Sequence, residues 1–369
     1  MFRYLRALVV LTTATAAHAH TPAPVTVTQL GSITITAPSG TPQPLDDTLA
    51  PVVVITPKTL KSFLDTDIAS LLRFYAGLDI ASNGGPGQPS SLFLRGTGSA
   101  QTLVMVDGIR VDDGVNGGAP LTNIGTSGVE KVEVVESPRS ALYGSDAIGG
   151  VVSITLKQPP RKGFAAGANI NGGHYSSRGI GAHAGGGNGT FFGGADFNWF
   201  ETAGFPTKTA SNQASAYRNQ SLHAIFGAQN GSGEAYATFW RSTGTTDYLN
   251  FALDPVGDDY TDRVASVHLA SQLDHDWHSR VILGQFFDGI DQVPGPNNPP
   301  GFTHTWRNSL DWRNDVNVGA HQLVSAGVFL AHQHVNANSF GTKYDEITRT
   351  RALYAQDQIH FGAHRIVLA

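Results

Sequence analysis

The stretch from Val129 to Leu156, VEKVEVVESPRSALYGSDAIGGVVSITL, decides the fold because alternation, turn residues and paired charges agree there. Apolar and charged residues interleave up to Glu136, and Ser137-Pro138 then ends the run, which predicts a strand followed by a turn. A second apolar run begins at Val151, after a glycine-rich corner. We expect two strands that pack around this corner. From periodicity alone, a hairpin-like corner in any α/β domain is an open alternative.

Composition excludes several classes of protein. The 369 residues contain 43 glycines and no cysteine, and Asp and Glu outnumber Lys and Arg by 29 to 24. The absence of cysteine removes disulfides, thiolate catalysis and cysteine-ligated metals. The slightly acidic balance argues against a nucleic-acid binder. No GxSxG or HExxH sequence occurs, so we expect no enzyme and no catalytic residues. No stretch reaches the roughly 18 apolar residues of a transmembrane helix, so a membrane would have to be crossed by strands.

The N-terminus has the features of an export signal. Arg3 and Arg6 precede an apolar run that begins at Ala7, and Ala17-His18-Ala19 supplies the small residues that a signal peptidase reads. We expect a signal peptide over residues 1–19 and a periplasmic extension over 20–43. A buried N-terminal helix is the alternative.

Residues 44–157 read as a compact α/β unit. The glycine-rich loop that begins at Asn83 could suggest phosphate binding, but a phosphate loop needs a Lys-Ser/Thr pair that opens a helix, and here a strand follows. The predicted elements are a strand over Val52–Ile55, helices over Thr56–Leu64 and Ile68–Tyr75 with Thr56 and Asp67 as N-caps, and strands over Gly77–Ile80, Leu92–Thr97 and Leu103–Arg110.

Three motifs in this unit resemble one family. They are NGGPGQPSSLFLRGT (83–97), LVMVDGIR (103–110) and SPRSALYGSDAIGGVVSI (137–154). They resemble the plug domain of TonB-dependent outer-membrane receptors and, within that superfamily, the vitamin B12 (cobalamin) receptors. The resemblance implies a transporter in the outer membrane, energised by the partner protein TonB, that takes up cobalamin or a related corrinoid. A siderophore receptor is one alternative; a truncated, non-transporting ligand-binding or remnant protein is another.

The resemblance also implies sites. Ligand-binding positions on the plug loops are Pro89, Ser91, Gly98, Val115 and Asn116. The β-favouring stretch after the signal peptide looks like the TonB box, and we expect an exposed, unpaired strand to which TonB adds its own strand; its residues are Ser32, Ile33, Thr34, Ile35, Thr36 and Ala37.

Six charged residues sit in or beside the plug strands. We expect them to face a polar lumen and to pair reversibly with barrel residues, and a solvated face of a small sheet is the alternative. These residues are Arg95, Asp107, Arg110, Glu130, Glu133 and Arg139.

The resemblance raises the possibility of calcium, because the family binds it through clustered Asp residues on barrel loops. The loop from Thr202 to Arg218 has no Asp or Glu, although the next loop has Asp247, Asp254, Asp258 and Asp259. We expect no calcium cluster of the family's kind and no cofactor. The spacings of His275 with His278 and of His332 with His334 do not by themselves fix a metal site, so we expect no metal.

After Gln158-Pro159-Pro160 the composition changes to Gly-Ala-aromatic segments of membrane-strand length. In one of them Trp306 and Trp312 are spaced like the aromatic residues that membrane barrels carry at the two membrane–water borders. Arg307, Asp311 and Arg313 would then face the interior of the barrel. A soluble β-sandwich is the alternative. The predicted strands are 164–170, 178–184, 190–199, 221–228, 234–241, 263–273, 279–287, 305–313, 322–330 and 351–361.

The expected fold is therefore an α+β plug domain over 44–157 followed by an antiparallel transmembrane β-barrel over 158–369. About ten strands are predicted, whereas plugged outer-membrane transporters have about 22. The end of the sequence, from Arg365 to Ala369, looks like a strand cut in the middle. We expect the chain to be a fragment or a truncated form of a receptor.

Overall fold

The computed structural model describes residues 33–37, 40, 42–45, 48–63, 67–75, 77–295, 299–339, 341–362 and 364–369. The predicted signal peptide, the first part of the predicted extension and Ser32 lie outside the described residues. No helix in the described part of the chain is long and apolar enough to cross a membrane.

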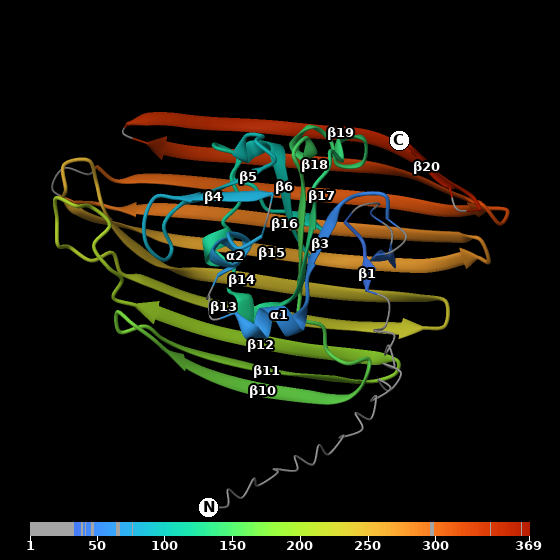
Figure 1. Ribbon diagram of the computed structural model, residues 1–369, viewed down its shortest axis with the longest axis horizontal. Coiled ribbons are helices and arrows are strands. Elements are labelled where there is room, and N and C mark those ends of the chain that lie inside the picture. Colours follow the sequence, from blue (N-terminus) through green and yellow to red (C-terminus); the bar gives the residue numbers. More distant parts are fainter. Residues whose placement is uncertain are drawn as a thin grey trace, which may run out of the picture.

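One antiparallel sheet of 11 strands, which we call the wall, dominates the structure, and its strands follow one another in sequence order (Figure 1). The ten strands predicted for this region correspond to the first ten. They are mostly longer than predicted, because polar residues beyond the apolar stretches continue the pairing. The eleventh is the short terminal stretch. The strands are β10 (Lys162–Gly172), β11 (Arg178–Asn188), β12 (Phe191–Thr202), β13 (Tyr217–Asn230), β14 (Gly233–Leu249), β15 (Pro255–Asp274), β16 (Trp277–Val293), β17 (Gly301–Val318), β18 (Gln322–Ser339), β19 (Thr342–Phe361) and β20 (His364–Leu368).

A smaller α/β unit, which we call the inner unit, lies against one face of the wall (Figure 1). Its main sheet has the order β3-β8-β9-β6-β7, with β6 and β9 parallel, and β4 and β5 form a separate pair. Its strands are β3 (Val52–Ile55), β4 (Leu78–Ser82), β5 (Ser90–Leu94), β6 (Thr102–Val106), β7 (Ile109–Arg110), β8 (Val129–Val135) and β9 (Gly150–Leu156). Its helices are α1 (Pro57–Ser62), α2 (Ile68–Leu72), α3 (Ser140–Tyr143) and the 3₁₀ turns η2 (Ser99–Gln101), η3 (Leu121–Asn123), η4 (Thr126–Gly128) and η5 (Ser145–Ala147).

The predicted corner between Val129 and Leu156 is confirmed. β8 and β9 pair antiparallel, and α3 and η5 fill the turn between them. Gly144 has φ 82°, a conformation that a side chain would disfavour. The predicted N-caps are confirmed as well, since the side chains of Thr56 and Asp67 accept hydrogen bonds from the first turns of α1 and α2.

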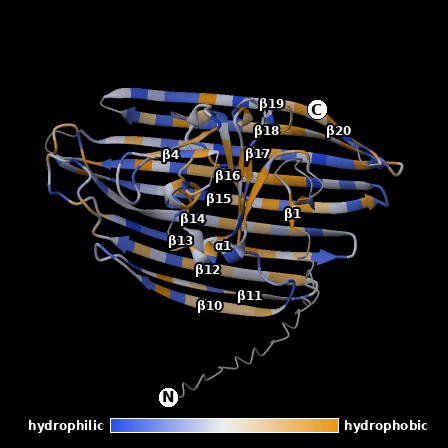
Figure 2. Cartoon of the chain, in the orientation of Figure 1, coloured by the Kyte–Doolittle hydropathy of each residue, from blue (hydrophilic) through white to orange (hydrophobic). Residues whose placement is uncertain are grey.

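The core of the inner unit extends into the wall. Its apolar side chains form one cluster that also includes Trp240, Val264, Ile282 and Phe286 of β14, β15 and β16. Residues of a strand alternate between the two faces of its sheet, so these four mark the face that the wall presents to the inner unit. Figure 2 shows the same alternation as hydrophobic and hydrophilic bands along the strands.

The two ends of the wall differ. One end, the tight end, carries short connections at 189–190, 231–232, 275–276 and 319–321. The other carries the longer connections at 203–216, 250–254 and 294–300, together with a short one at 340–341. In outer-membrane barrels the short turns face the periplasm and the longer loops face outward. The N-terminal strands β1 (Thr34–Ile35) and β2 (Gln43–Pro44) lie at the tight end, where Arg280 of β16 donates a hydrogen bond to the carbonyl of Gly40 at 2.7 Å.

Candidate functional site

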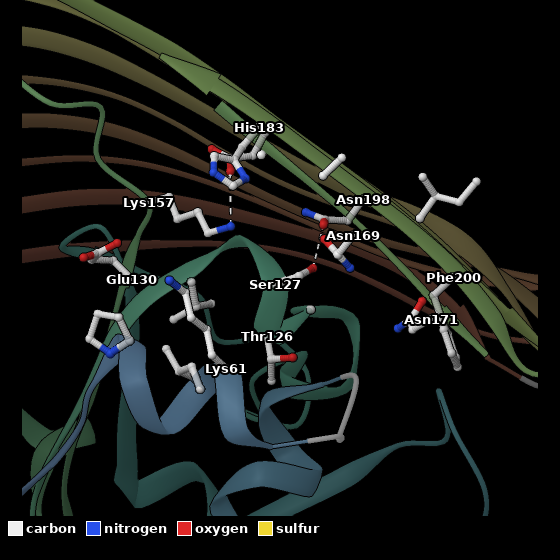
Figure 3. A pocket seen from close by; sticks show the side chains of 18 of the residues that line it. Lys61, Thr126, Ser127, Glu130, Lys157, Asn169, Asn171, His183, Asn198 and Phe200 are labelled. Atoms are coloured by element: carbon white, nitrogen blue, oxygen red, sulfur yellow. Dashed lines mark hydrogen bonds and ion pairs between the residues drawn. The ribbon is translucent and has the colours of Figure 1, made fainter. Parts of the chain in front are cut away.

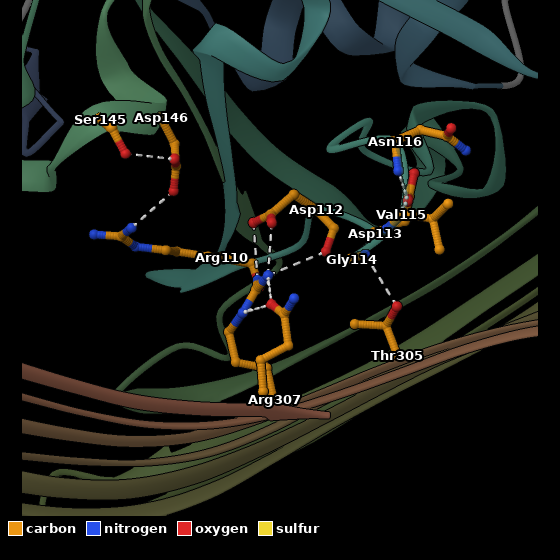
Figure 4. A network of polar contacts seen from close by, with 11 residues as sticks. Arg110, Asp112, Asp113, Gly114, Val115, Asn116, Ser145, Asp146, Thr305 and Arg307 are labelled. Carbon is orange, nitrogen blue, oxygen red and sulfur yellow. Dashed lines mark hydrogen bonds and ion pairs between the residues drawn. The ribbon is translucent and has the colours of Figure 1, made fainter. Parts of the chain in front are cut away.

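The strongest polar contact between the inner unit and the wall is a bidentate ion pair. Arg307 of β17 donates to both carboxylate oxygens of Asp112, at 2.8 and 2.6 Å, and to the side-chain oxygen of Gln333 (Figure 4). The side chain of Arg307 is 8% exposed and that of Asp112 is 23% exposed. Such a fork-to-fork pair fixes orientation as well as distance. The predicted inward direction of Arg307 is confirmed, whereas sequence analysis missed its partner Asp112.

Further contacts on the same side hold the loops that flank this pair. The backbone N–H of Gly114 donates to Thr305 Oγ1 at 3.0 Å, and Asn123 Nδ2 donates to Asp262 Oδ2 at 2.8 Å. A Cβ on Gly114 would lie 2.2 Å from the side chain of Val335, so only glycine allows this approach. The inner unit is thus tied to β15, β17 and β18 by the loops at Gly114 and Asn123.

On the opposite side a cavity of about 620 Å³ separates the inner unit from β10, β11, β12 and β13 (Figure 3). Two side-chain contacts join the inner unit to β12: Ser127 donates to Asn198 at 2.6 Å, and Lys157 pairs with Asp196 at 3.7 Å. From β13, the side chains of Tyr217 and Asn219 donate to the carbonyls of Thr122 and Asn123. The wall there is lined by small and amide side chains, among them Gly167, Asn169, Asn171, Ala184 and Asn198. The attachment of the inner unit is therefore uneven, firm on the β15–β18 side and sparse on the β10–β12 side.

The N-terminal segment 33–37 is docked, so the prediction of an exposed, unpaired strand was wrong. β1 pairs antiparallel with β2, and Ile35 is 0% exposed. Glu133 Oε2 accepts hydrogen bonds from the backbone N–H groups of Thr36 and Ala37, at 2.9 and 2.7 Å. The segment can bury its backbone because a carboxylate on β8 satisfies donors that would otherwise be lost from water.

Glu133 is itself a buried carboxylate with several partners. Its side chain is 2% exposed, and Oε1 pairs with Lys131 Nζ at 2.6 Å. The same ammonium donates to the carbonyl of Thr34, and the hydroxyl of Tyr143 donates to the carbonyl of Ala37. The docked segment is therefore held through its backbone by three side chains of the inner unit.

The structure places the five predicted ligand residues in two groups at the longer-loop end. Val115 and Asn116 form a turn in which both backbone N–H groups donate to Asp113 Oδ1, and Gly117 in this turn adjoins Ala100, close to Gly98. Pro89 and Ser91 belong to the other group.

The loop that carries Pro89 and leads into Ser91 lies against different strands. Gln88 donates to the carbonyl of Asp247, and a Cβ on Gly87 would lie 2.0 Å from the ring of Tyr217. The first group thus lies by β17 and β18, and the second lies by β13 and β14. The part of these residues in ligand binding remains a prediction.

The six charged residues of the inner unit act mostly within it, which differs from the expected pairing with barrel residues. Arg95 donates to the carbonyl of Glu136, and Arg110 bonds Asp146 and the carbonyl of Tyr143, while Arg110 also lies over the wall ring of Phe329 at 4.2 Å. Asp107 accepts a hydrogen bond from the N–H of Leu156, and Glu133 binds the N-terminal segment. Glu130 lines the cavity. Arg139 Nε has no hydrogen-bond partner in the described part of the chain.

Asp112 and Lys157 of the inner unit form ion pairs with the wall. Both residues come just after a strand, β7 and β9 respectively, and lie outside the three motifs of the sequence analysis. A signal was available for the first: Asp112-Asp113 is a double acidic step in a loop, and an inward Arg307 needed a counter-charge. Nothing local in the sequence shows which carboxylate meets which arginine, because the partners come from distant parts of the chain.

Asp107 gives a pH-dependent prediction. Burial raises the pKa of Asp107 above its ordinary value of 3.8. A carboxyl whose folded pKa is raised lowers stability once pH exceeds the unfolded pKa. We expect Asp107→Asn, which keeps the acceptor for Leu156 and tolerates the φ of 47°, to raise the free energy of unfolding at pH 7.

The difference between Asp107→Asn and the parent should vanish as pH falls below 3.8, where both side chains are neutral in the unfolded chain. Denaturant unfolding across a pH series measures it. Asp107→Ala is the control, and it should lose about 1 to 3 kcal/mol because the N–H of Leu156 loses its acceptor. A gain from Asp107→Asn that is equal at pH 3 and pH 7 would contradict the electrostatic explanation.

The residues that the structure describes contain no group of three or more His, Asp or Glu side chains placed to hold a metal ion. Of the four histidines considered from the sequence, His334 pairs with Asp345 at 2.7 Å and His275 pairs with Asp276 at 3.0 Å.

Comparison with known proteins agrees with this geometry. Residues 44–151 match the TonB-dependent Receptor Plug Domain family. The chain is also similar to the solved structure of FpvA from P. aeruginosa bound to heterologous pyoverdines, with a TM-score of 0.77 and 14% identity over 90% of this chain and 53% of that one.

Two other solved structures are similar. The ferric enterobactin receptor of Pseudomonas aeruginosa has a TM-score of 0.68 and 17% identity, over 85% of this chain and 56% of that one. The siderophore receptor PirA of Acinetobacter baumannii has a TM-score of 0.67 and 16% identity, over 84% and 54%. The chain thus spans about half the length of these structures. The fold is a plug domain with part of the strand wall of TonB-dependent receptors.

Proposed function

We propose that this chain, whose residues 44–151 match the plug of TonB-dependent receptors, is an outer-membrane receptor that takes up a ferric siderophore. The observation that carries the proposal is a plug-type inner unit bonded to a strand wall, with its N-terminal segment docked at the tight-turn end. The ligand class is supported by the three similar structures, which are receptors for siderophores.

In this proposal the two ends of the wall have different tasks. The scarce nutrient binds at the longer-loop end, where the turn at Val115 and the loop at Pro89 lie. TonB acts at the tight-turn end by adding a strand to the segment from Ser32 to Ala37. Because β8 carries Glu133 and is hydrogen-bonded on both sides, by β3 and β9, a pull on the segment acts on an interior strand of the inner sheet.

The uneven attachment of the inner unit suggests how it yields. The contacts to β10 and β12 are few and polar, and polar contacts exchange for water at a small net cost. The apolar cluster shared with β14, β15 and β16 is more costly to expose. A pull should therefore open the β10–β12 side first, with the inner unit still attached to the other side.

Cobalamin is the second candidate ligand. The three motifs at 83–97, 103–110 and 137–154 favour it, since within the superfamily they resemble the plug of the cobalamin receptors.

Ligand binding distinguishes the two candidates. We expect outer membranes that carry the chain to bind ferric enterobactin or ferric pyoverdine at sub-micromolar concentration, without competition from cyanocobalamin. Deletion of residues 32–37 should stop uptake and leave binding unchanged, because the segment lies at the opposite end from the ligand loops. Saturable cyanocobalamin binding that ferric chelates do not displace would favour the second candidate. Binding without uptake in every form would favour a non-transporting protein.

A further inference from the structure

Two arginines on the outward face of the wall lie directly opposite each other. Arg241 of β14 and Arg263 of β15 are register partners. Their sequence neighbours Trp240 and Val264 belong to the core shared with the inner unit, and Asp262 bonds Asn123 of that unit. Since side chains alternate along a strand, both arginines point away from the inner unit.

Among the residues that the structure describes, no side chain supplies a counter-charge to this pair. Like charges directly opposite each other across two strands are destabilising. Within the described chain neither guanidinium has a hydrogen bond or an ion pair, and Arg263 lies over the ring of Phe287 at 5.4 Å. The outward residues around them on the same four strands are all uncharged: Gln220, Leu222, Ala224, Phe239, Thr243, Thr261, Ala265, Gln285, Phe287 and Gly289. Two positive charges are therefore held together with an open place for an anion.

The pair lies at the border of an apolar band. Phe287 is the register partner of Arg263 and Trp306 is the partner of Phe287, so arginines and aromatic rings share one row. Trp312 lies on the same face of β17, six residues beyond Trp306 towards the tight end, and it is 46% exposed. At about 3.4 Å per residue the two tryptophans are roughly 20 Å apart. Aromatic residues in membrane barrels mark the two borders of the lipid-facing band, so the arginines lie at the level of lipid headgroups on the longer-loop side.

We propose that Arg241 and Arg263 together bind the phosphate group of an anionic membrane lipid. One phosphate between the two guanidinium groups neutralises the repulsion that their register creates, and guanidinium matches phosphate with two parallel hydrogen bonds. The acyl chains of the lipid would lie over the exposed side chains of Val267, Leu283 and Leu330, which are closer to the tight end of the wall than the two arginines are. The proposal rests on the proposed function only in that the wall is inserted in a membrane.

The test uses the full chain folded in uncharged maltoside micelles and two lipid probes, bisphosphorylated lipid A and the same lipid without its phosphates. Native mass spectrometry should show one phosphorylated lipid retained and the dephosphorylated lipid released. Arg241→Gln with Arg263→Gln should lower retention at least about tenfold, because both charge-assisted contacts are lost. Millimolar inorganic phosphate should not displace the lipid, since the free ion lacks the acyl chains.

A matched control removes the same charge elsewhere on the outward face. Arg349→Gln with Arg351→Gln changes two arginines of β19 whose register partners are His332 and Leu330, and we expect no loss of retention. Arg263→Glu creates an opposite-charge pair with Arg241, so it should abolish retention while raising the melting temperature without lipid. Equal loss in the control pair, equal retention of the dephosphorylated lipid, or full retention in the Arg241/Arg263 double variant would each overturn the proposal.

The folded state is followed separately by heat-dependent mobility in detergent gels. A chain that folds in micelles but shows no preference for the phosphorylated lipid contradicts the lipid site alone. A chain that does not fold in micelles or vesicles contradicts the membrane receptor proposed above, and the lipid site with it.

Discussion

Replacement of Arg307 by alanine is expected to lower the free energy of unfolding by about 3 to 5 kcal/mol, the cost of removing one partner of a buried ion pair. Asp112 would keep its carboxylate in a largely buried place without its bidentate partner, and the carbonyl of Arg110 would lose a donor as well. Guanidinium unfolding of the chain from vesicles, followed by tryptophan fluorescence, measures the change. The loop from Asp112 to Asn116 should also become more open to protease.

The control for Arg307 is the exposed pair between Arg178 and Glu201, in which the arginine is 69% exposed. Arg178→Ala should cost no more than about 1 kcal/mol, because water screens a surface pair. The double variant Arg307→Met with Asp112→Leu should recover most of the loss, since it removes both charges at once. A loss below 1 kcal/mol in Arg307→Ala would show that water or another cation replaces the guanidinium.

Replacement of Glu133 by alanine is expected to release the N-terminal segment. The change removes two charge-assisted hydrogen bonds to the backbone of Thr36 and Ala37. At about 1.5 kcal/mol for each bond, the loss is about 3 kcal/mol, or roughly a hundredfold more undocked segment. Hydrogen exchange of these two amides should accelerate by about that factor, and a purified TonB C-terminal domain should capture the variant faster than the parent.

Glu130→Ala is the matched control, because Glu130 lies on the same strand and lines the open cavity. Its exchange rates at Thr36 and Ala37 should equal those of the parent. Glu133→Gln should give an intermediate result, since the amide keeps an acceptor but loses the charge that strengthens both bonds. Unchanged protection of the two amides in Glu133→Ala would mean that the pairing of β1 with β2 holds the segment by itself.

Much of the fold could be predicted from local patterns. The alternation in Val129–Glu136, the stop at Ser137-Pro138 and the glycines before Val151 predicted the β8–β9 corner, and Thr56 and Asp67 predicted the starts of two helices. Ten of the eleven wall strands were predicted in place, but their ends were not. A strand's apolar centre is visible in the sequence, whereas its polar ends continue only because a neighbouring strand pairs with them.

The functional contacts were less predictable. Segment 33–37 reads as an unpaired strand, since nothing in its sequence shows that Glu133, about 100 residues away, will accept its N–H groups. Arg307 was correctly expected to point inward, but its partner was unknown. The two groups of predicted ligand residues share glycine-rich, turn-forming sequence, yet they lie against different parts of the wall.

The sequence by itself determined which stretches are strands, which residues cap and turn them, and which side of the strand at 305–313 carries its charged residues, because these depend on neighbours a few residues apart. Only the tertiary structure decided which charges meet. Asp112 and Arg307 are 195 residues apart in the chain, and the N-terminal segment is docked on β8 instead of free. A carboxylate pairs with the donor that the tertiary fold brings within about 3 Å of it, and the local sequence does not show which donor that is.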